Sequence, residues 1–322
     1  MIHRTLVTGL VLAALSSTLL ASNGRNPGSL LMFPEFDNTV GTRTVVTVTN
    51  LDTVMTNDPI EVEFMYIGKY DTNGDSIGCL EFNRTETLTP ADTITLLTDA
   101  HNPEHEQGYL YVFTKNASTH LAQTHNFLIG NVMSVNGILA FEYAINPVSY
   151  LGIGSDDGDG ILALDNVEYS GTPGEIVIPR FFGQNGVRQS ELIMIGLSGG
   201  TAFSTTIDFL IFNDNEEIFS SEHTFQCWER THLIDISGVF ANGFLANWTN
   251  DDPLELVGLP NIETGWIHIE GAQYSSNTVT YPDPSVYAVL VERIGNLGIA
   301  DLPFEMGATR LNGELLPHNI GS

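Results

Sequence analysis

Positive charge is scarce in this 322-residue chain: 11 lysines and arginines stand against 39 aspartates and glutamates, for a formal net charge of −28. Proteins that bind a nucleic-acid backbone or an anionic membrane surface need clustered basic side chains. The composition therefore excludes nucleic-acid binding and argues against an anionic membrane as partner. The acidity does not indicate disorder, because hydrophobic residues make up 42% and charged residues only 16% of the chain.

Sequence motifs of common catalytic sites are also missing. The chain has no Gly-x-Ser-x-Gly nucleophile motif and no Walker loop, and it contains only two lysines, Lys69 and Lys115. Carboxylates are numerous, so a pair of acids for glycoside hydrolysis stays open. We therefore expect a protein that is not an enzyme, with a hydrolase as the alternative.

Long apolar runs are absent after the N-terminus. Residues 1–24 start with a positive charge at Arg4, continue with an apolar stretch from Leu6 to Leu20, and end in small residues. This is the pattern of a secretory signal peptide, and the stretch is short and interrupted for a membrane span. We expect a mature chain without a membrane span that is secreted to the extracellular space or cell surface, with the periplasm open.

The rest of the sequence consists of two similar copies, which share six pairs of segments in the same order. The pairs are LMFPEF (31–36) with VIPRFF (177–182), the strands 45–48 with 192–195, IEVEFMYI (60–67) with TTIDFLIF (205–212), FNRT (82–85) with WERT (228–231), EQGYLYV (106–112) with ETGWIHI (263–269), and IGN (129–131) with IGN (294–296). Collinear matches of this kind indicate an internal duplication.

Within each copy the hydrophobic period is that of β-strands. Val62, Phe64 and Tyr66 alternate with other residues, and turn-forming glycine, proline, asparagine and aspartate separate the strands. We predict an all-β fold of two tandem β-sandwich, immunoglobulin-like domains after the signal peptide. The expected bounds are 1–24 for the signal peptide, 25–150 for domain 1, 151–174 for a Gly/Asp-rich linker and 175–322 for domain 2.

Several longer segments resemble an uncharacterised group of secreted bacterial proteins with duplicated β-sandwich domains. They include FPEFDN (33–38), EFNRT (81–85), HNPEHEQGYLYVF (101–113), HNFLIGNV (125–132), IPRFFGQ (178–184) and FLIFNDNEE (209–217). The resemblance spans most of the mature chain. It implies an exported bacterial β protein and no established activity.

Two acidic loops are candidate calcium sites, because calcium prefers six to eight hard oxygen ligands. One loop places Asp71, Asn73 and Asp75 at alternate positions, and the other combines Asp156, Asp157 and Asp159 with glycines. The same residue types also favour a hairpin turn and a flexible linker for backbone reasons. Both interpretations stay open at this point.

The two cysteines, Cys79 and Cys227, form either a disulfide across the domain boundary or two buried thiols. The arginines of the FNRT and WERT segments, Arg84 and Arg230, are notable because arginine is scarce. We expect a structural role for both, in which each holds a carboxylate or a carbonyl.

These observations favour an exported, non-catalytic binding or assembly protein of the cell surface or extracellular matrix. Its partners would be further copies of itself or cell-surface polymers. Two alternatives stay open: a carbohydrate-active hydrolase or sugar-binding module that uses acidic and aromatic residues, and a calcium-dependent adhesion module.

Overall fold

The computed structural model describes residues 26–154, 162–213, 216–248, 262–295 and 297–314. The predicted signal peptide (1–24) and the acidic cluster at 156–159 lie outside these residues. Within them the chain is all-β, with a few single-turn helices. No described helix is long and apolar enough to cross a membrane.

The first half of the chain forms a β-sandwich of two antiparallel sheets. Its elements are β1 (Leu30–Asp37), β2 (Thr42–Asn50), β3 (Ile60–Asp71), β4 (Ser76–Leu88), β5 (Thr93–Leu97), α1 (Thr98–His101), β6 (His105–Lys115), β7 (Leu128–Asn136), β8 (Phe141–Ile145) and β9 (Val148–Tyr150). One sheet has the strand order β4-β3-β6-β1-β9 and the other β5-β2-β7-β8.

The second half forms another sandwich. Its elements are β11 (Glu175–Phe182), β12 (Arg188–Gly196), η1 (Gly200–Ala202), β13 (Ser204–Asn213), β14 (Ile218–Phe225), β15 (Trp228–His232), α2 (Leu233–Ile236), η2 (Gly238–Phe240), α3 (Asn242–Leu245), β16 (Thr264–Ser275), β17 (Thr280–Pro282), β18 (Val286–Ile294), β19 (Leu297–Asp301) and β20 (Phe304–Met306). One sheet has the order β14-β13-β16-β11-β20, with β17 beside β16, and the other β15-β12-β18-β19.

Between the sandwiches lies the segment predicted as a linker. Its described part contains β10 (Ala163–Leu164), which pairs with β21 (Gly313–Glu314) near the end of the described chain. Leu164 and Tyr169 are buried there. This part of the segment therefore packs against the domains.

The two sandwiches have the same topology, as an internal duplication requires. Strands β1 to β9 occupy the same places in their sheets as β11 to β16 and β18 to β20. Even the irregularities agree: the register of β1 shifts between Phe33 and Phe36, and that of β11 between Ile178 and Phe181. Each bulge holds the proline that aligns the two copies, Pro34 or Pro179, in keeping with the confinement of proline to bulges and edges.

Two of the six sequence matches are wrong at the level of structure. Arg84 lies on β4, whereas Arg230 lies on β15, which is the counterpart of β5. The registers place Arg230 opposite Ile193 and Thr95 opposite Thr47, so Thr95 is the counterpart of Arg230. The Ile-Gly-Asn pair also fails, because Ile129 is near the start of β7 whereas Ile294 ends β18. Short polar matches of this kind occur by chance in chains rich in turns.

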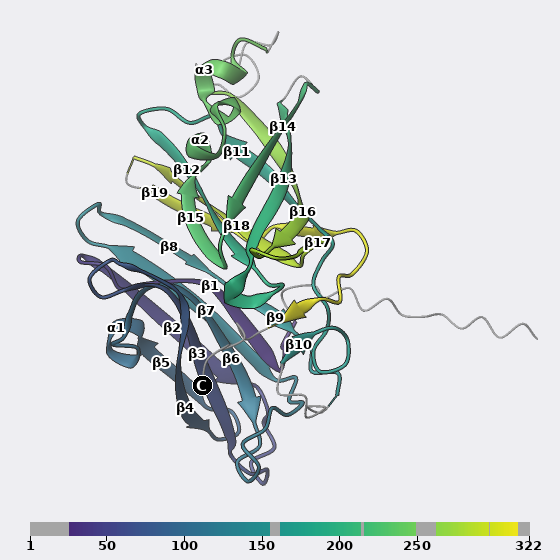
Figure 1. Ribbon diagram of the computed structural model, residues 1–322. Helices are drawn as coiled ribbons and strands as arrows, with labels where there is room; N and C mark the ends of the chain where they lie inside the picture. The colour runs from purple at the N-terminus through teal and green to yellow at the C-terminus, as the bar shows by residue number, and fades with distance from the viewer. Residues whose placement is uncertain (1–25, 155–161, 214–215, 249–261, 296, 315–322) are drawn as a thin grey trace, which may run out of the picture.

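The two sandwiches lie against each other, the second above the first in Figure 1. The two halves meet most extensively where β8 lies beside β19, at the edges of the two four-stranded sheets. The five-stranded sheet of the first sandwich also contacts the four-stranded sheet of the second through β1 with β12 and β6 with β15. All of β1 is buried, and β3, β6 and β18 have continuous buried runs instead of alternation. Strands that are covered on both faces show this pattern.

Covalent and polar contacts reinforce this packing. Cys79 of β4 and Cys227, which precedes β15, form a disulfide with a Cα–Cα distance of 6.6 Å. Of the two possibilities left by the sequence, the structure has the bridge. The Trp228 indole N–H donates to the carbonyl of Pro34 at 2.9 Å, and Lys69 Nζ donates to the carbonyl of Gln226 at 3.2 Å.

Candidate functional site

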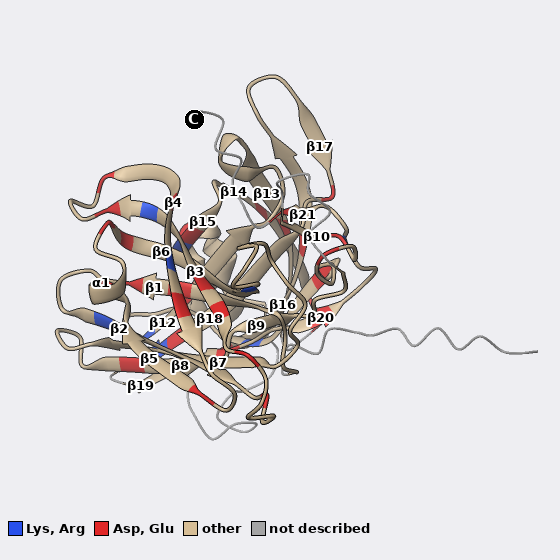
Figure 2. Cartoon of the chain, turned by 90° about the horizontal axis from the view of Figure 1, so that it is seen from below, with Lys and Arg blue, Asp and Glu red and all other residues tan. Residues whose placement is uncertain are grey.

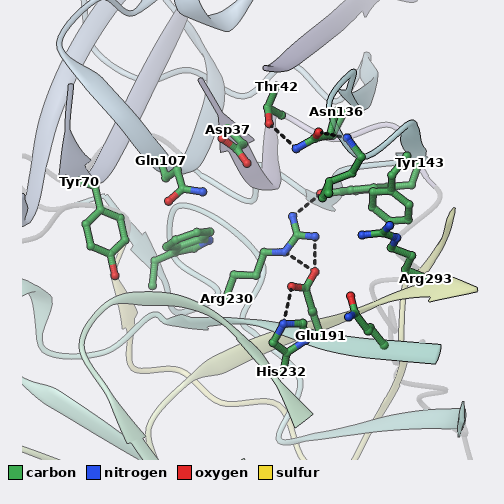
Figure 3. A pocket seen from close by; sticks show the side chains of 15 residues that line it. Asp37, Thr42, Tyr70, Gln107, Asn136, Tyr143, Glu191, Arg230, His232 and Arg293 are labelled. Atoms are coloured by element: carbon green, nitrogen blue, oxygen red, sulfur yellow. Dashed lines mark hydrogen bonds and ion pairs between the residues drawn. The ribbon is translucent and has the colours of Figure 1, made fainter. Parts of the chain in front are cut away.

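A cleft of about 550 Å³ lies between the two sandwiches. The first sandwich contributes side chains from β1, β2, β3, β6, β7 and β8, among them Asp37, Thr42, Tyr70, Gln107, Asn136 and Tyr143. The second contributes side chains from β12, β15 and β18, namely Gln189, Glu191, Trp228, Arg230, His232 and Arg293. Figure 3 shows both groups of side chains facing the same space.

Arg230 is the central cation of the cleft and joins the two sandwiches. Its Nη1 donates to both carboxylate oxygens of Glu35 at 2.8 and 2.9 Å, and its Nε donates to Glu191 at 3.0 Å. Tyr143 also contacts this Nη1, at 3.3 Å, and donates its hydroxyl to Glu35. One guanidinium thus holds a carboxylate from each half of the chain.

Glu35 sits in the bulge of β1 and is only 3% exposed. Burial raises the pKa of Glu35 to about 7, although Arg230 opposes the shift. Besides burial, the neighbouring carboxylates Asp37 and Glu191 also raise the pKa of Glu35. Glu35 does not line the cleft itself but lies behind Arg230.

The other acids of the cleft are also engaged. Glu191 accepts from Arg230 and has His232 Nε2 at 3.6 Å. Asp37 is 8% exposed and accepts from the backbone N–H of Thr39 at 2.9 Å. The carboxylates of the cleft therefore serve mainly to hold the walls.

Arg293 differs from Arg230 in its partners. Its Nε donates to the carbonyl of Gly295 at 2.8 Å, and its guanidinium lies 5.8 Å from the ring centroid of Phe141. No acidic side chain within the described part of the chain forms an ion pair with it. Arg293 is half-buried and lines the cleft.

Electrostatically the cleft stands apart from the rest of the molecule. Figure 2 shows acidic segments distributed over both sandwiches and few basic ones. Two of the 11 basic residues, Arg230 and Arg293, line this one cleft. Its charge is thus nearly balanced within a chain whose net charge is −28.

The predicted calcium residues are only partly described. Asp71, Asn73 and Asp75 form the turn between β3 and β4, where Asp71 Oδ1 accepts from the N–H groups of Asn73 and Asp75 at 2.8 and 3.0 Å. These hydrogen bonds lower the pKa of Asp71. No group of three or more metal-ligating side chains occurs among the residues that the structure describes. Asp156, Asp157 and Asp159 lie outside them, and calcium binding stays a prediction.

The two arginines singled out in the sequence have different surroundings. Arg230 holds Glu35 and Glu191, whereas Arg84 is exposed, with its guanidinium 5.8 Å from the ring of Phe82. The structural role expected for both therefore has a described carboxylate partner only at Arg230.

Five aromatic residues are candidates for sugar stacking: Tyr109, Tyr111, Trp228, Trp248 and Trp266. Tyr109, Tyr111 and Trp228 are buried between the sandwiches. Trp248 is 50% exposed and packs against Phe219 and Phe244. Trp266 is 36% exposed and stacks on Phe212 on the second sandwich, with a centroid distance of 3.8 Å. The aromatic side chains of the cleft are instead Tyr70, Phe141 and Tyr143, together with the covered Trp228.

Sequence reasoning missed most of the cleft. Glu191, Arg293, Gln107 and Gln189 gave no signal, because they come from strands far apart in the chain that only the packing of the sandwiches brings together. Arginine scarcity was the one usable signal, and it pointed to Arg230.

Comparisons with known proteins add little. No protein-family model matches the chain, and no curated protein matches it either. Among solved structures, the N-terminal CBM22-1-CBM22-2 tandem domain of Paenibacillus barcinonensis Xyn10C is similar at 10% identity, over 86% of this chain and 85% of that chain. Its TM-score of 0.18 is too low for the similarity to bear on fold or function.

Proposed function

We propose that this chain is an exported, non-catalytic binding protein that holds a hydroxyl-rich ligand, such as an oligosaccharide of a cell-surface polymer, in the cleft between its sandwiches. The observation that carries the proposal is the cleft itself, with about 550 Å³ and walls from both halves. Ligand sites typically enclose about 300–1,000 Å³ and often lie between domains.

The side chains that face the cleft suit a ligand with many hydroxyl groups. Gln107, Gln189 and Asn136 offer amides that both donate and accept, and Thr42 and Ser134 offer hydroxyls. Tyr70 adds a partly exposed aromatic ring. Amphipathic aromatic rings beside polar groups match the alternating apolar and polar faces of a sugar.

Rigid walls favour binding, because an ordered site loses little entropy when the ligand enters. The disulfide, the Trp228–Pro34 hydrogen bond and the Arg230–Glu35 ion pair all cross the boundary that the cleft occupies.

The chemistry of the acids favours binding over hydrolysis. A glycosidase needs two carboxyl groups that reach the substrate from either side of the scissile bond. Glu35 lies behind Arg230, and Glu191 is bound by Arg230. The disulfide between Cys79 and Cys227 supports export, since such bonds persist in oxidising compartments.

The proposal is tested by calorimetric titration of the purified chain with a panel of neutral and acidic oligosaccharides. We expect at least one to bind, and Gln107→Ala and Gln189→Ala to weaken that binding about 5- to 50-fold through lost hydrogen bonds. Gln273→Ala is the matched control, because Gln273 is exposed on β16 and does not line the cleft. Binding that is unaffected by both cleft variants, or no binding across the panel, would refute the proposal.

A further inference from the structure

Arg293 lines the cleft, and no acidic side chain among the described residues forms an ion pair with it. Most of the described basic side chains are paired with acids: Arg43 with Asp99, Lys115 with Glu63, Arg180 with Glu292, Arg230 with Glu35 and Glu191, and Arg310 with Glu270. Within the part of the chain that the structure describes, Arg293 is thus a cation of the cleft that is available to a ligand.

The guanidinium of Arg293 is held in a fixed orientation. The Nε–H bond to the carbonyl of Gly295 and the contact with the Phe141 ring leave the two terminal amino groups for another partner. These two groups form a fork that matches the two oxygens of a carboxylate.

Gln189 stands next to this fork. It pairs directly with Arg293 across β12 and β18, so both side chains lie on the same face of the sheet. Its amide can donate a further hydrogen bond to an anion beside the guanidinium. Tyr70 lies at the opposite side of the cleft in Figure 3, which leaves room for the rest of a ligand between them.

We infer that the ligand of the cleft carries a carboxylate, which Arg293 and Gln189 bind, so that the site prefers an acidic saccharide such as one with a uronate unit. This inference rests on the proposed function and narrows its ligand class. The net charge of −28 does not prevent such binding. At physiological ionic strength distant charges are screened over about 8 Å, so the local guanidinium dominates for a ligand with a single charge.

The test uses three related disaccharides: one with a single glucuronate unit, its methyl ester, and the neutral parent sugar. Calorimetric titration of the full mature chain should show the acid binding at least 10-fold tighter than the ester and the parent. Arg293→Gln should remove this preference while it leaves the affinity for the ester within about 3-fold, and Arg293→Lys should retain part of it, because lysine keeps the charge without the fork.

Arg84→Gln is the matched control, because Arg84 is exposed on β4, does not line the cleft and has no ion pair within the described residues. It removes one positive charge from the chain as Arg293→Gln does, and it should leave all three affinities unchanged. Thermal unfolding of each variant shows that it is folded.

The outcomes separate this inference from the proposed function. Equal binding of acid, ester and parent, or a preference for the acid that survives Arg293→Gln, overturns the role of Arg293 but leaves a saccharide-binding cleft. If none of the three binds and no other saccharide does, both proposals fail.

Discussion

At the scale of single residues, Arg230 is expected to contribute to stability. It compensates Glu35, which is buried, and Glu191 on the other wall of the cleft. We expect Arg230→Met to lower the free energy of unfolding by about 1–3 kcal/mol near pH 7, because Glu35 and Glu191 lose their shared donor while Glu35, whose pKa is already raised, takes up a proton. Chemical denaturation measures this loss.

A matched variant and a double variant complete that experiment. Arg84→Met should change the free energy of unfolding by less than about 0.5 kcal/mol, because Arg84 is exposed. Adding Glu35→Gln to Arg230→Met should recover part of the loss, since the neutral amide needs neither a cation nor a proton in the buried bulge. An equal loss of unfolding free energy in Arg230→Met and Arg84→Met would contradict the proposed role of Arg230 in holding Glu35 and Glu191.

Glu35 itself makes stability depend on pH. Burial raises its pKa in the folded state to about 7, above its ordinary value of 4.5. The folded chain therefore keeps a proton that the unfolded chain releases, and this contribution is full below about pH 4.5 and is lost as the pH rises through about 7.

We expect Glu35→Gln to remove this dependence. The difference in unfolding free energy between wild type and variant should shift against the wild type by about 3 kcal/mol between pH 4.5 and pH 7. Comparison of the two proteins cancels the other acids, including Glu305, whose pKa burial also raises to about 7. A difference that stays constant with pH would show that folding does not raise the pKa of Glu35.

At the scale of strands, the duplication explains two glycines at equivalent positions. A Cβ on Gly108 of β6 would lie 1.9 Å from the carbonyl oxygen of Ile67, and one on Gly265 of β16 would lie 2.3 Å from that of Phe212. Gly108 pairs with Phe36 and Gly265 pairs with Phe181. Each of these phenylalanines lies two residues after the proline of its bulge. The bulge and the glycine opposite it therefore form one structural feature, which is present in both copies.

Substitution of these two glycines tests the close approach of the strands directly. We expect Gly108→Ala and Gly265→Ala each to lower the free energy of unfolding by about 1–3 kcal/mol, because a methyl group meets backbone there. Gly186→Ala is the control, since a Cβ at Gly186 would meet nothing within 4 Å. If all three variants melt alike, the close approach of these strands is not present in solution.

Equivalent strands also show how side chains decide which sheet face is covered. Ile193 and Ile195 of β12 are buried against the first sandwich, whereas their counterparts on β2 are Thr47 and Thr49. The two threonines form cross-strand hydrogen bonds with Thr95 and Thr93 on an exposed face. One copy thus has an interface where the other has a solvated surface.

At the scale of the whole molecule, this difference argues for a single copy in solution. The first sandwich covers the second with the face of β1 and β6, and the corresponding face of the second carries Asp208, Glu222 and Glu270 in one row across β14, β13 and β16. Glu270 is paired with Arg310, but Asp208 and Glu222 face each other directly, and adjacent like charges oppose close packing.

We therefore expect a monomer in sedimentation velocity over a wide range of concentration. Oligomers or filaments that grow with concentration would instead support the assembly function that the sequence left open.

The disulfide acts at the same scale, since it closes a loop with a sequence separation of 148. Chain entropy alone would give a stabilisation of about 5 kcal/mol for such a loop, and measured values are usually about 2–4 kcal/mol. We expect the double variant Cys79→Ser/Cys227→Ser to lose about 2–4 kcal/mol of unfolding free energy and to have a lower melting temperature. A reducing agent should lower the melting temperature of the wild type and not that of the variant; an unchanged wild type would contradict the bridge.

By itself the sequence determined the strand period, the duplication and the sandwich class, because alternation, turn residues and repeated segments are local properties of the chain. Local patterns also limited what could be predicted from the sequence. The FNRT and WERT segments look alike, but they lie on strands that are not equivalent in the two sandwiches. Only the tertiary structure decided that Arg230 meets Glu35, that Cys79 reaches Cys227, and that Arg293 faces Tyr70 across a cleft. The physical reason is that each of these pairs joins the two sandwiches, and the way two sheets pack depends on the shape and charge of whole faces.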